Sequence, residues 1–316
     1  MSAGLLDICI GIVSGNNREM TLECLRSLIA SISDDLRFEI HFVDNAAPEH
    51  WFNDVRSLSP ILHVHRNERR KGFGANHNMI ISGIDAKYYL LLNDDTYVYP
   101  GFCEELVRQA EANPECGFFG PKLLNTDGTI QRSVYRFPTP LWAAIEALQL
   151  NKFFGGWRMF NDYRTFAYEQ ICPVDFVSGA ALLARKEMLD QIGLLDEGFF
   201  MYAEEADWCF RAKQRNWATL FIPGACITHH GGQSTLTLAP ERSVEFLRSH
   251  ARLIRKHFGE AGLLLYRWCN LIKHLPRMLY AKIADLPQSK QLAEQDIVLW
   301  SLGLLKRSGL SEIAKP

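Results

Sequence analysis

The chain has 316 residues, of which 47% are hydrophobic and 22% are charged. This composition excludes wholesale disorder and allows one large α/β domain with a smaller C-terminal part. The formal net charge of -2 excludes a global electrostatic basis for binding nucleic acid, so any anion needs a local site.

The eight cysteines form no C-x-x-C pair, which predicts reduced thiols that fill the core of a cytoplasmic protein. No basic segment followed by a long apolar stretch begins the chain, so no signal peptide is predicted. No apolar run reaches the ~18 residues that span a bilayer. We therefore expect a cytoplasmic protein that can still lie on the inner face of the cytoplasmic membrane.

Apolar segments alternate with helical segments through the first half of the chain. Strands are expected at 8–13, 38–44, 61–66 and 88–94, and helices at about 21–31, 75–84 and 101–112. This alternation predicts an α/β fold with a mostly parallel sheet and helices on both faces. Ligands of such sheets bind beyond the carboxyl ends of the strands.

Polar residues follow two of these strands: Asp44 and Asn45 end the second, and Asn93, Asp94 and Asp95 end the fourth. Adjacent carboxylates at a strand end suit a hard cation such as Mg²⁺, and Asp95 is the predicted metal ligand. A polar turn before YVYPG explains the same string about equally well. The first strand is followed by SGNNRE rather than G-x-G-x-x-G, which argues against a dinucleotide-dependent oxidoreductase.

The second half begins with an aromatic, irregular segment at about 137–169 whose elements the sequence leaves unassigned. Residues 174–193 predict a strand and then a helix, residues 204–217 predict another helix, and residues 218–232 predict a strand that ends in a glycine-rich turn. Beyond about Pro240 the chain is predicted to be helical to its end.

Three acids, Glu204, Glu205 and Asp207, open the helix predicted at 204–217. Acids in a first turn are favoured by the helix dipole whatever the function. The aromatic run at 199–202 can desolvate a neighbouring carboxylate and raise its pKa towards the range of a general base, for which Glu205 is the candidate.

Two more motifs carry candidate ligands. The loop NERRKGFGANHNMI can receive phosphate through amides and a helix N-terminus, with Gly72, Gly74 and Asn78 as donor contacts. Most of the basic residues here are expected to be solvated loop charges, namely Arg66, Arg69, Arg70 and Lys71. The string ITHHGGQS ends a strand with His229 and His230, and a neutral imidazole would complete a mixed oxygen and nitrogen metal shell.

The strings VDNAAPE, KGFGANHN, LLLNDDT, FVSGAALLARKEMLDQIGLLDEGFFMYAEEADWCFR and HHGGQS occur together and in this order. Their combination, over roughly residues 8–235, resembles the family-two inverting glycosyltransferases of GT-A fold, and among them the rhamnosyltransferase-like branch. The resemblance implies that Asp44 contacts the nucleoside, with Val13 and Ser14 lining its pocket. It also implies that Asp95 is the metal-binding acid of a D-x-D-like motif, written here Asn93-Asp94-Asp95.

In the acceptor half, Glu205 stands where the family has the aspartate of a Glu-Asp pair, its catalytic base. The choice between Glu204 and Glu205 therefore stays open. His229 matches the family's metal- or diphosphate-associated histidine, with His230 as the alternative. Gly179, in the matching FVSGAA, and Asp207 are further candidates.

The resemblance implies a GT-A (Rossmann-like) domain at 1–238, with a donor half at about 1–130 and an acceptor half at about 131–238, and a C-terminal helical region at 239–316. It implies transfer of a sugar, with L-rhamnose from dTDP-rhamnose favoured, to a bacterial cell-surface polysaccharide or lipid-linked glycan. Mn²⁺ or Mg²⁺ is the implied cofactor. Another nucleotide-sugar donor, a nucleotidyltransferase and a non-catalytic sugar-nucleotide-binding assembly protein are the alternatives.

The segment LLLYRWCNLIKHLPRMLYAKI mixes apolar and aromatic residues with Arg267, Lys273, Arg277 and Lys282. This pattern is typical of an interfacial helix, so peripheral contact with a membrane is one hypothesis. Packing on the catalytic domain or in a homodimer, with Pro276 breaking or kinking the helix, is the other.

Overall fold

The computed structural model describes residues 5–14, 17–33, 35–46, 49–154, 163, 166–231 and 239–305. Contacts along the chain divide it into two compact units. Unit 1 comprises Met1–Tyr135, Ala167–Gly198 and Glu204–Leu236, and unit 2 comprises Arg136–Phe166, Phe199–Ala203 and Thr237–Pro316. The domain division at residue 238 remains a prediction from the sequence.

Unit 1 contains the strands and most of the short helices. Its strands are β1 (Leu6–Val13), β2 (Phe38–Asp44), β3 (Leu62–Arg66), β4 (Ala86–Asn93), β5 (Thr96–Val98), β6 (Cys116–Leu124), β7 (Ile130–Gln131), β8 (Val134–Tyr135), β9 (Cys172–Val174), β10 (Phe176–Val177), β11 (Ala181–Arg185) and β12 (Ala218–His229). Its helices are α1 (Arg18–Ser31), α2 (Glu49–Arg56), α3 (Phe73–Gly83), α4 (Phe102–Ala112), α7 (Lys186–Ile192) and α8 (Glu204–Gln214).

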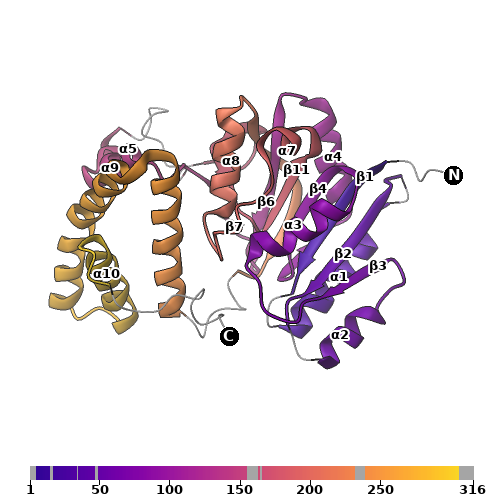
Figure 1. Ribbon diagram of the computed structural model, residues 1–316, viewed down its shortest axis with the longest axis horizontal. Coiled ribbons are helices and arrows are strands. Elements are labelled where there is room, and N and C mark those ends of the chain that lie inside the picture. Colours follow the sequence, from indigo (N-terminus) through magenta and orange to yellow (C-terminus); the bar gives the residue numbers. More distant parts are fainter. Residues whose placement is uncertain are drawn as a thin grey trace. The chain divides into compact units, whose positions relative to one another are not determined.

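Within the described residues, ten strands form one sheet with the order β3-β2-β1-β4-β11-β6-β12-β5, to which β7 adds at β6 and β9 at β12. Strands β1 to β4 run parallel to one another, and β12 runs parallel to β6. Strand β11 is antiparallel to both β4 and β6. Figure 1 shows β1, β2 and β3 side by side in unit 1. The predicted mostly parallel α/β fold is confirmed.

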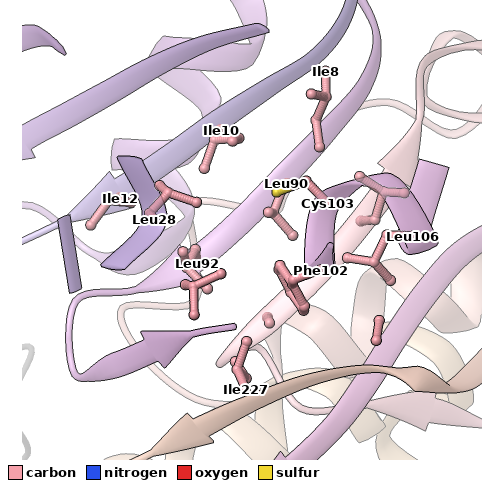
Figure 2. Close-up of a cluster of buried hydrophobic side chains, with 14 of the residues drawn as sticks. Ile8, Ile10, Ile12, Leu28, Leu90, Leu92, Phe102, Cys103, Leu106 and Ile227 are labelled. Atoms are coloured by element: carbon pink, nitrogen blue, oxygen red, sulfur yellow. The ribbon is translucent and has the colours of Figure 1, made fainter. Parts of the chain in front are cut away.

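The central strand β1 is buried on both faces, which explains its nearly continuous apolar sequence. On one face, Ile8, Ile10 and Ile12 join a cluster that includes Leu28 of α1 and Leu92 of β4, as Figure 2 shows. The helix α1 begins where Asn17 accepts a hydrogen bond from a backbone amide of its first turn. The continuous apolar sequence of β1 thus matches a strand that is covered on both faces.

A glycine allows the opposite face of β1 to meet α3. A Cβ atom at Gly11 would lie 3.0 Å from both His77 Nδ1 and Ile80 Cδ1. A side chain at this position would therefore crowd His77 and Ile80 of α3.

The predicted strands and helices of the first half agree with β1 to β4 and with α1, α3 and α4 to within three residues at each end. Sequence analysis does not predict α2, because its eight residues are too few for a clear helical period. The antiparallel direction of β11 is not predictable from the sequence either, because it depends on which strands β11 pairs with in the folded sheet.

Unit 2 contains α5 (Pro140–Ala147), α6 (Leu150–Phe153), α9 (Ala239–Ile283) and α10 (Gln288–Ser301). Helices α5 and α10 pack against α9 (Figure 1). Pro276, expected to break or kink this segment, lies inside the helix and does not end it, whereas the residue with non-helical dihedral angles is Gly259. Its φ of 67° is a conformation that glycine adopts without a steric penalty. No helix in the described part of the chain is both long and apolar enough to cross a bilayer.

Candidate active site

Three parallel strands of unit 1 end at the same edge of the sheet. Val13, the last residue of β1, pairs with Val43 of β2 and with Asn93 of β4. Ser14 and Asp44 follow at this edge, and both are buried. Predicted donor-site residues from three segments therefore lie together at the carboxyl ends of the strands, where open α/β sheets bind ligands.

The carboxylate of Asp44 is 1% exposed and lies at the end of β2. Arg66 Nε, at the end of β3, is 3.4 Å from Asp44 Oδ2. The backbone amide of the next residue, Asn45, donates to Ser14 Oγ at 2.9 Å. Arg66, expected as a solvated charge, instead faces this carboxylate, which offsets part of the cost of burying it.

Three asparagines hold the loop between β3 and α3. Asn67 Nδ2 donates to the side-chain oxygens of Asn45 at 3.1 Å and of Asn76 at 2.6 Å. The Lys71 amide donates to Asn45 Oδ1 at 2.9 Å, and Asn76 Nδ2 donates to the Gly72 carbonyl at 2.9 Å. The network orders the glycine-containing loop beside Asp44. Sequence analysis identifies Asn45 but misses Asn67 and Asn76, because a loop asparagine carries no signal of its partners.

Two other residues of this motif hold a distant loop. Asn78 Nδ2 donates to the Leu195 carbonyl at 2.9 Å and to Glu197 Oε1 at 3.0 Å, and its Oδ1 accepts from the Leu195 amide at 3.1 Å. A Cβ atom at Gly74 would lie 3.2 Å from Leu195 Cβ. Both residues pack α3 against the segment before α8. Direct contacts of Gly72, Gly74 and Asn78 with a donor remain predictions.

The predicted metal ligands Asp95 and His229 lie next to each other. Strand β12 pairs His229 with Thr96 of β5, directly after Asp95. His229 Nε2 is 3.2 Å from Asp95 Oδ1. The alternative, His230, contacts the same aspartate through its backbone, whose amide donates to the Asp95 carbonyl at 2.9 Å. Folding therefore brings together an acid and an imidazole from two separate motifs.

Gln131, which sequence analysis missed, orients His229. Gln131 Nε2 donates to Asn125 Oδ1 at 2.9 Å and to the His229 carbonyl at 3.0 Å. Its Oε1 is then the acceptor that faces His229 Nδ1 at 2.6 Å, so Nδ1 carries the ring proton. The Nε2 lone pair points towards Asp95, with Asn93 Nδ2 at 3.4 Å. Metal-ligating histidines are commonly oriented in this way.

This donor set fits a divalent cation. A neutral imidazole lone pair 3.2 Å from a carboxylate oxygen is unfavourable unless a cation or a proton lies between them. A carboxylate is a suitable ligand for both Mg²⁺ and Mn²⁺, and the imidazole favours Mn²⁺ over Mg²⁺ because Mn²⁺ is a transition metal. Asp94 faces α1 instead, because its Oδ2 accepts from Thr21 Oγ1 at 2.7 Å. The two adjacent acids therefore have different surroundings.

Glu205, in the first turn of α8, lies beside Gly179 and Phe73. A Cβ atom at Gly179 would be 3.9 Å from Glu205 Cδ and 3.8 Å from Phe73 Cζ. Burial raises the pKa of Glu205 to about 7, against the lowering effect of its own backbone amide and that of Ala206. This is the direction that sequence analysis predicts. A carboxyl group with this pKa can accept a proton near neutral pH.

The two other acids of this turn are more deeply buried. Glu204 is 5% exposed, whereas Glu205 is only half-buried. Asp207 is fully buried, and its Oδ2 accepts from Arg211 Nε at 2.9 Å. Arg211 also donates to the Leu194 carbonyl at 2.7 Å. Asp207 thus orients Arg211, which ties α8 to the preceding loop, and a role for Asp207 in binding or catalysis remains a prediction.

Solved glycosyltransferases share the fold. The mannosyltransferase PcManGT from Pyrobaculum calidifontis, in complex with GDP-Man and Mn²⁺, aligns with 96% of this chain and 88% of its own, at a TM-score of 0.61 and 13% identity. GalNAc-T7 with UDP, GalNAc and Mn²⁺ aligns with 96% of this chain and 57% of its own, at a TM-score of 0.59 and 14% identity. This chain therefore has the same fold as these two proteins.

Residues 9–193 match the model of glycosyl transferase family 2, and the chain belongs to this family. It is 30% identical over 149 residues to the N-acetylglucosaminyl-diphospho-decaprenol L-rhamnosyltransferase of Mycobacterium tuberculosis, covering 47% of this chain and 48% of the relative. It is 26% identical over 200 residues to the low-salt glycan biosynthesis hexosyltransferase Agl10 of Haloferax volcanii, covering 61% of this chain and 59% of the relative. The matches thus span about half the length of these relatives. They confirm the resemblance to the rhamnosyltransferase-like branch.

Proposed function

We propose that this chain is a metal-dependent inverting glycosyltransferase that transfers L-rhamnose from dTDP-rhamnose to a hydroxyl of a lipid-linked glycan or cell-surface polysaccharide. The observation that carries the metal-dependent donor site is the Asp95–His229 pair, 3.2 Å apart at the strand ends that also hold Asp44. The Mycobacterium relative, whose name specifies an L-rhamnosyltransferase and a diphospho-decaprenol-linked acceptor, supports the choice of sugar and acceptor.

In the proposed donor site, Asp44 binds the nucleoside, and Asp95 and His229 hold Mn²⁺ or Mg²⁺. When bound, the ion supplies positive charge beside the diphosphate that leaves. Gln131 keeps the ring proton of His229 on Nδ1 and so leaves Nε2 free to act as a ligand. The Asn45–Asn67–Asn76 network orders the adjacent loop before the donor arrives.

In the proposed reaction, Glu205 takes the proton of the acceptor hydroxyl while that oxygen attacks the anomeric carbon. The bond from the anomeric carbon to the diphosphate oxygen breaks, and the nucleoside diphosphate leaves. A single displacement of this kind inverts the anomeric configuration. The pKa of Glu205 of about 7 supports this role, because such a carboxylate is basic enough to accept the proton and about half of it is ionised at pH 7.

The first test is thermal unfolding with dTDP, UDP, GDP and CDP, each with and without Mn²⁺ or Mg²⁺. A ligand at 100 times its Kd adds about 2.7 kcal/mol to the free energy of unfolding. We expect metal-dependent stabilisation by dTDP that is lost in Asp95→Asn and retained in Glu23→Gln, a control at an exposed acid of α1. If a different nucleotide stabilises the protein instead, the donor is a sugar linked to that nucleotide and not dTDP-rhamnose. No stabilisation by any nucleotide would overturn the donor site.

Turnover is tested with dTDP-rhamnose and a polyprenyl-diphosphate-linked sugar as the acceptor, with the product anomer assigned by NMR. Wild type should form the inverted product, and Glu205→Gln should bind dTDP normally but form product at least 100-fold more slowly. Normal donor binding without turnover in wild type would favour the sugar-nucleotide-binding assembly protein or a different acceptor.

We also propose that α9 lies on an anionic membrane surface where such an acceptor is found. Large apolar residues recur along one side of α9 and are exposed, namely Leu264, Trp268, Ile272, Leu275, Leu279 and Ile283. Residues 261–284 contain four lysines and arginines and no acid. Lys273 pairs with Glu146, whereas Arg277 and Lys282 are exposed, and their charge complements anionic lipid headgroups.

Vesicle sedimentation tests this surface. Wild type should bind vesicles of phosphatidylglycerol but not of phosphatidylcholine, and Trp268→Ser with Ile272→Ser should weaken binding at least tenfold. If the double variant binds equally well, this side of α9 is not the membrane surface. If it instead converts a dimer into a monomer in light scattering, the stripe is a homodimer interface.

A further inference from the structure

A cluster of imidazole and carboxylate groups lies on strands β2 and β3, outside the residues assigned to sugar transfer. Glu39 and His41 alternate along β2, and His63 and His65 alternate along β3. Because side chains two residues apart share one face of a sheet, and because His41 pairs with His63 in the parallel register, the four side chains lie together. Sequence analysis does not identify them.

Three of these groups converge on one point. Glu39 Oε2 is 2.9 Å from His41 Nε2 and 4.0 Å from His63 Nε2, and the three ligand atoms all lie within 4.8 Å of one another. The rings of His41 and His63 are nearly parallel, with centroids 4.7 Å apart. Ligand atoms bound to a tetrahedral ion at about 2.0–2.1 Å are roughly 3.4 Å apart. Small side-chain rotations are therefore enough to place all three around one ion.

The fourth group, His65, supports His41 from behind. His41 Nδ1 is 2.9 Å from His65 Nε2, and the ring centroids are 5.3 Å apart. When His41 donates its Nδ1 proton to His65, its Nε2 presents a lone pair towards Glu39 and His63. A hydrogen bond from the second ring nitrogen is the usual support of a metal-ligating histidine.

Burial and neighbouring imidazoles lower the pKa of two of these histidines. Burial lowers the pKa of His41, and His63 and His65 lower it further, although Glu39 acts in the opposite direction. Burial, with His63, also lowers the pKa of His65. On the adjacent strand β1, burial and Glu39 raise the pKa of Cys9 to about 12, so this thiol stays protonated.

We propose that Glu39, His41 and His63 bind one divalent transition-metal ion, with Zn²⁺ as the best match, at a site separate from the Asp95–His229 pair. Two imidazoles and one carboxylate select a borderline ion over Mg²⁺. His63 is half exposed, which leaves a coordination position for water. The ion ties the edge strand β3 to β2 and so stabilises this edge of the sheet.

The register of the sheet separates the two metal sites. His41 pairs with Gly11 of β1, and Gly11 pairs with Leu91 of β4. Strand β1 thus lies between β2 and β4, and Asp95 belongs to the turn that follows the end of β4 at Asn93. Loss of one site should therefore leave the other intact.

The test uses the full chain without a polyhistidine tag, stripped of metal by a chelator. Zn²⁺ binding is measured by titration calorimetry and by the rise in unfolding temperature, and Co²⁺ reports the coordination geometry through its visible absorption. Wild type should bind one Zn²⁺ tightly and give a tetrahedral Co²⁺ spectrum. His63→Ala and Glu39→Gln should each bind Zn²⁺ at least tenfold more weakly, whereas His257→Ala, a histidine of unit 2, should bind as wild type does.

Asp95→Asn separates this site from the proposed donor site. It should retain Zn²⁺ binding and the Co²⁺ spectrum while losing nucleotide-dependent stabilisation by Mn²⁺. The proposal is overturned if wild type binds Zn²⁺ no more tightly than His63→Ala and Glu39→Gln do, or if Asp95→Asn abolishes the binding. Retained stabilisation by nucleotide and Mn²⁺ in His63→Ala establishes that this variant is folded.

Discussion

Replacing Glu205 by glutamine should stabilise the protein above pH 7 while it removes the proposed base. Burial raises the pKa of Glu205 from 4.5 to about 7. At 1.36 kcal/mol per pKa unit, the difference between 7 and 4.5 corresponds to about 3 kcal/mol. Because the folded state holds this proton more tightly, the stabilisation is fully present below pH 4.5 and is lost as the pH rises through 7. Ionisation of Glu205 therefore lowers the stability of the folded state, and glutamine, which cannot ionise, does not.

The assay is urea unfolding of wild type, Glu205→Gln and the exposed-acid control Glu23→Gln at pH 4, 6 and 8. At pH 4 the free energies of unfolding of wild type and Glu205→Gln should agree. At pH 8 Glu205→Gln should be more stable by about 3 kcal/mol, which raises the unfolding temperature by about 6 °C at 2 °C per kcal/mol. Glu23→Gln should follow wild type at every pH.

The same group should control the rate of sugar transfer. In wild type, kcat/KM should fall tenfold per pH unit below about pH 7 and level off above it. A stability difference between wild type and Glu205→Gln that does not change from pH 4 to pH 8 would refute the raised pKa. If Glu204→Gln shows the pH-dependent gain instead, the titrating carboxyl group is that of Glu204.

Two further predictions concern the residue that orients His229 and the close packing of the sheet at Gly120. Gln131→Leu should lower metal affinity 10- to 100-fold, measured as Mn²⁺-dependent stabilisation by dTDP, because His229 loses the partner that orients it; unchanged affinity would remove Gln131 from the site. Gly120→Ala should cost about 1–3 kcal/mol in urea unfolding, since its Cβ would lie 2.5 Å from Val177, whereas Gly83→Ala, where nothing lies within 4 Å, should not destabilise.

Residues of the candidate site could be predicted where a polar side chain stands at the end of an apolar strand. Asp44, Asp95 and His229 each follow or end an apolar strand, and the parallel strands bring their ends to one edge. Gln131 escaped prediction because it contacts a histidine 98 residues away and belongs to a strand of only two residues. The structural roles of Asn78 and Asp207 were not predictable either. Asn78 contacts a residue 117 positions away, and Asp207 contacts Arg211, and neither pairing has a signal in the sequence.

The order and type of most elements follow from the sequence by itself, because the alternation of apolar residues records which positions are shielded from water. The motifs at the strand ends, read together, also indicate the family. Only the tertiary structure decides the antiparallel insertion of β11 between β4 and β6 and the meeting of Glu39, His41 and His63 across two strands. It also decides the raised pKa of Glu205. These properties depend on which surfaces meet and how much water they exclude, and local sequence does not encode either.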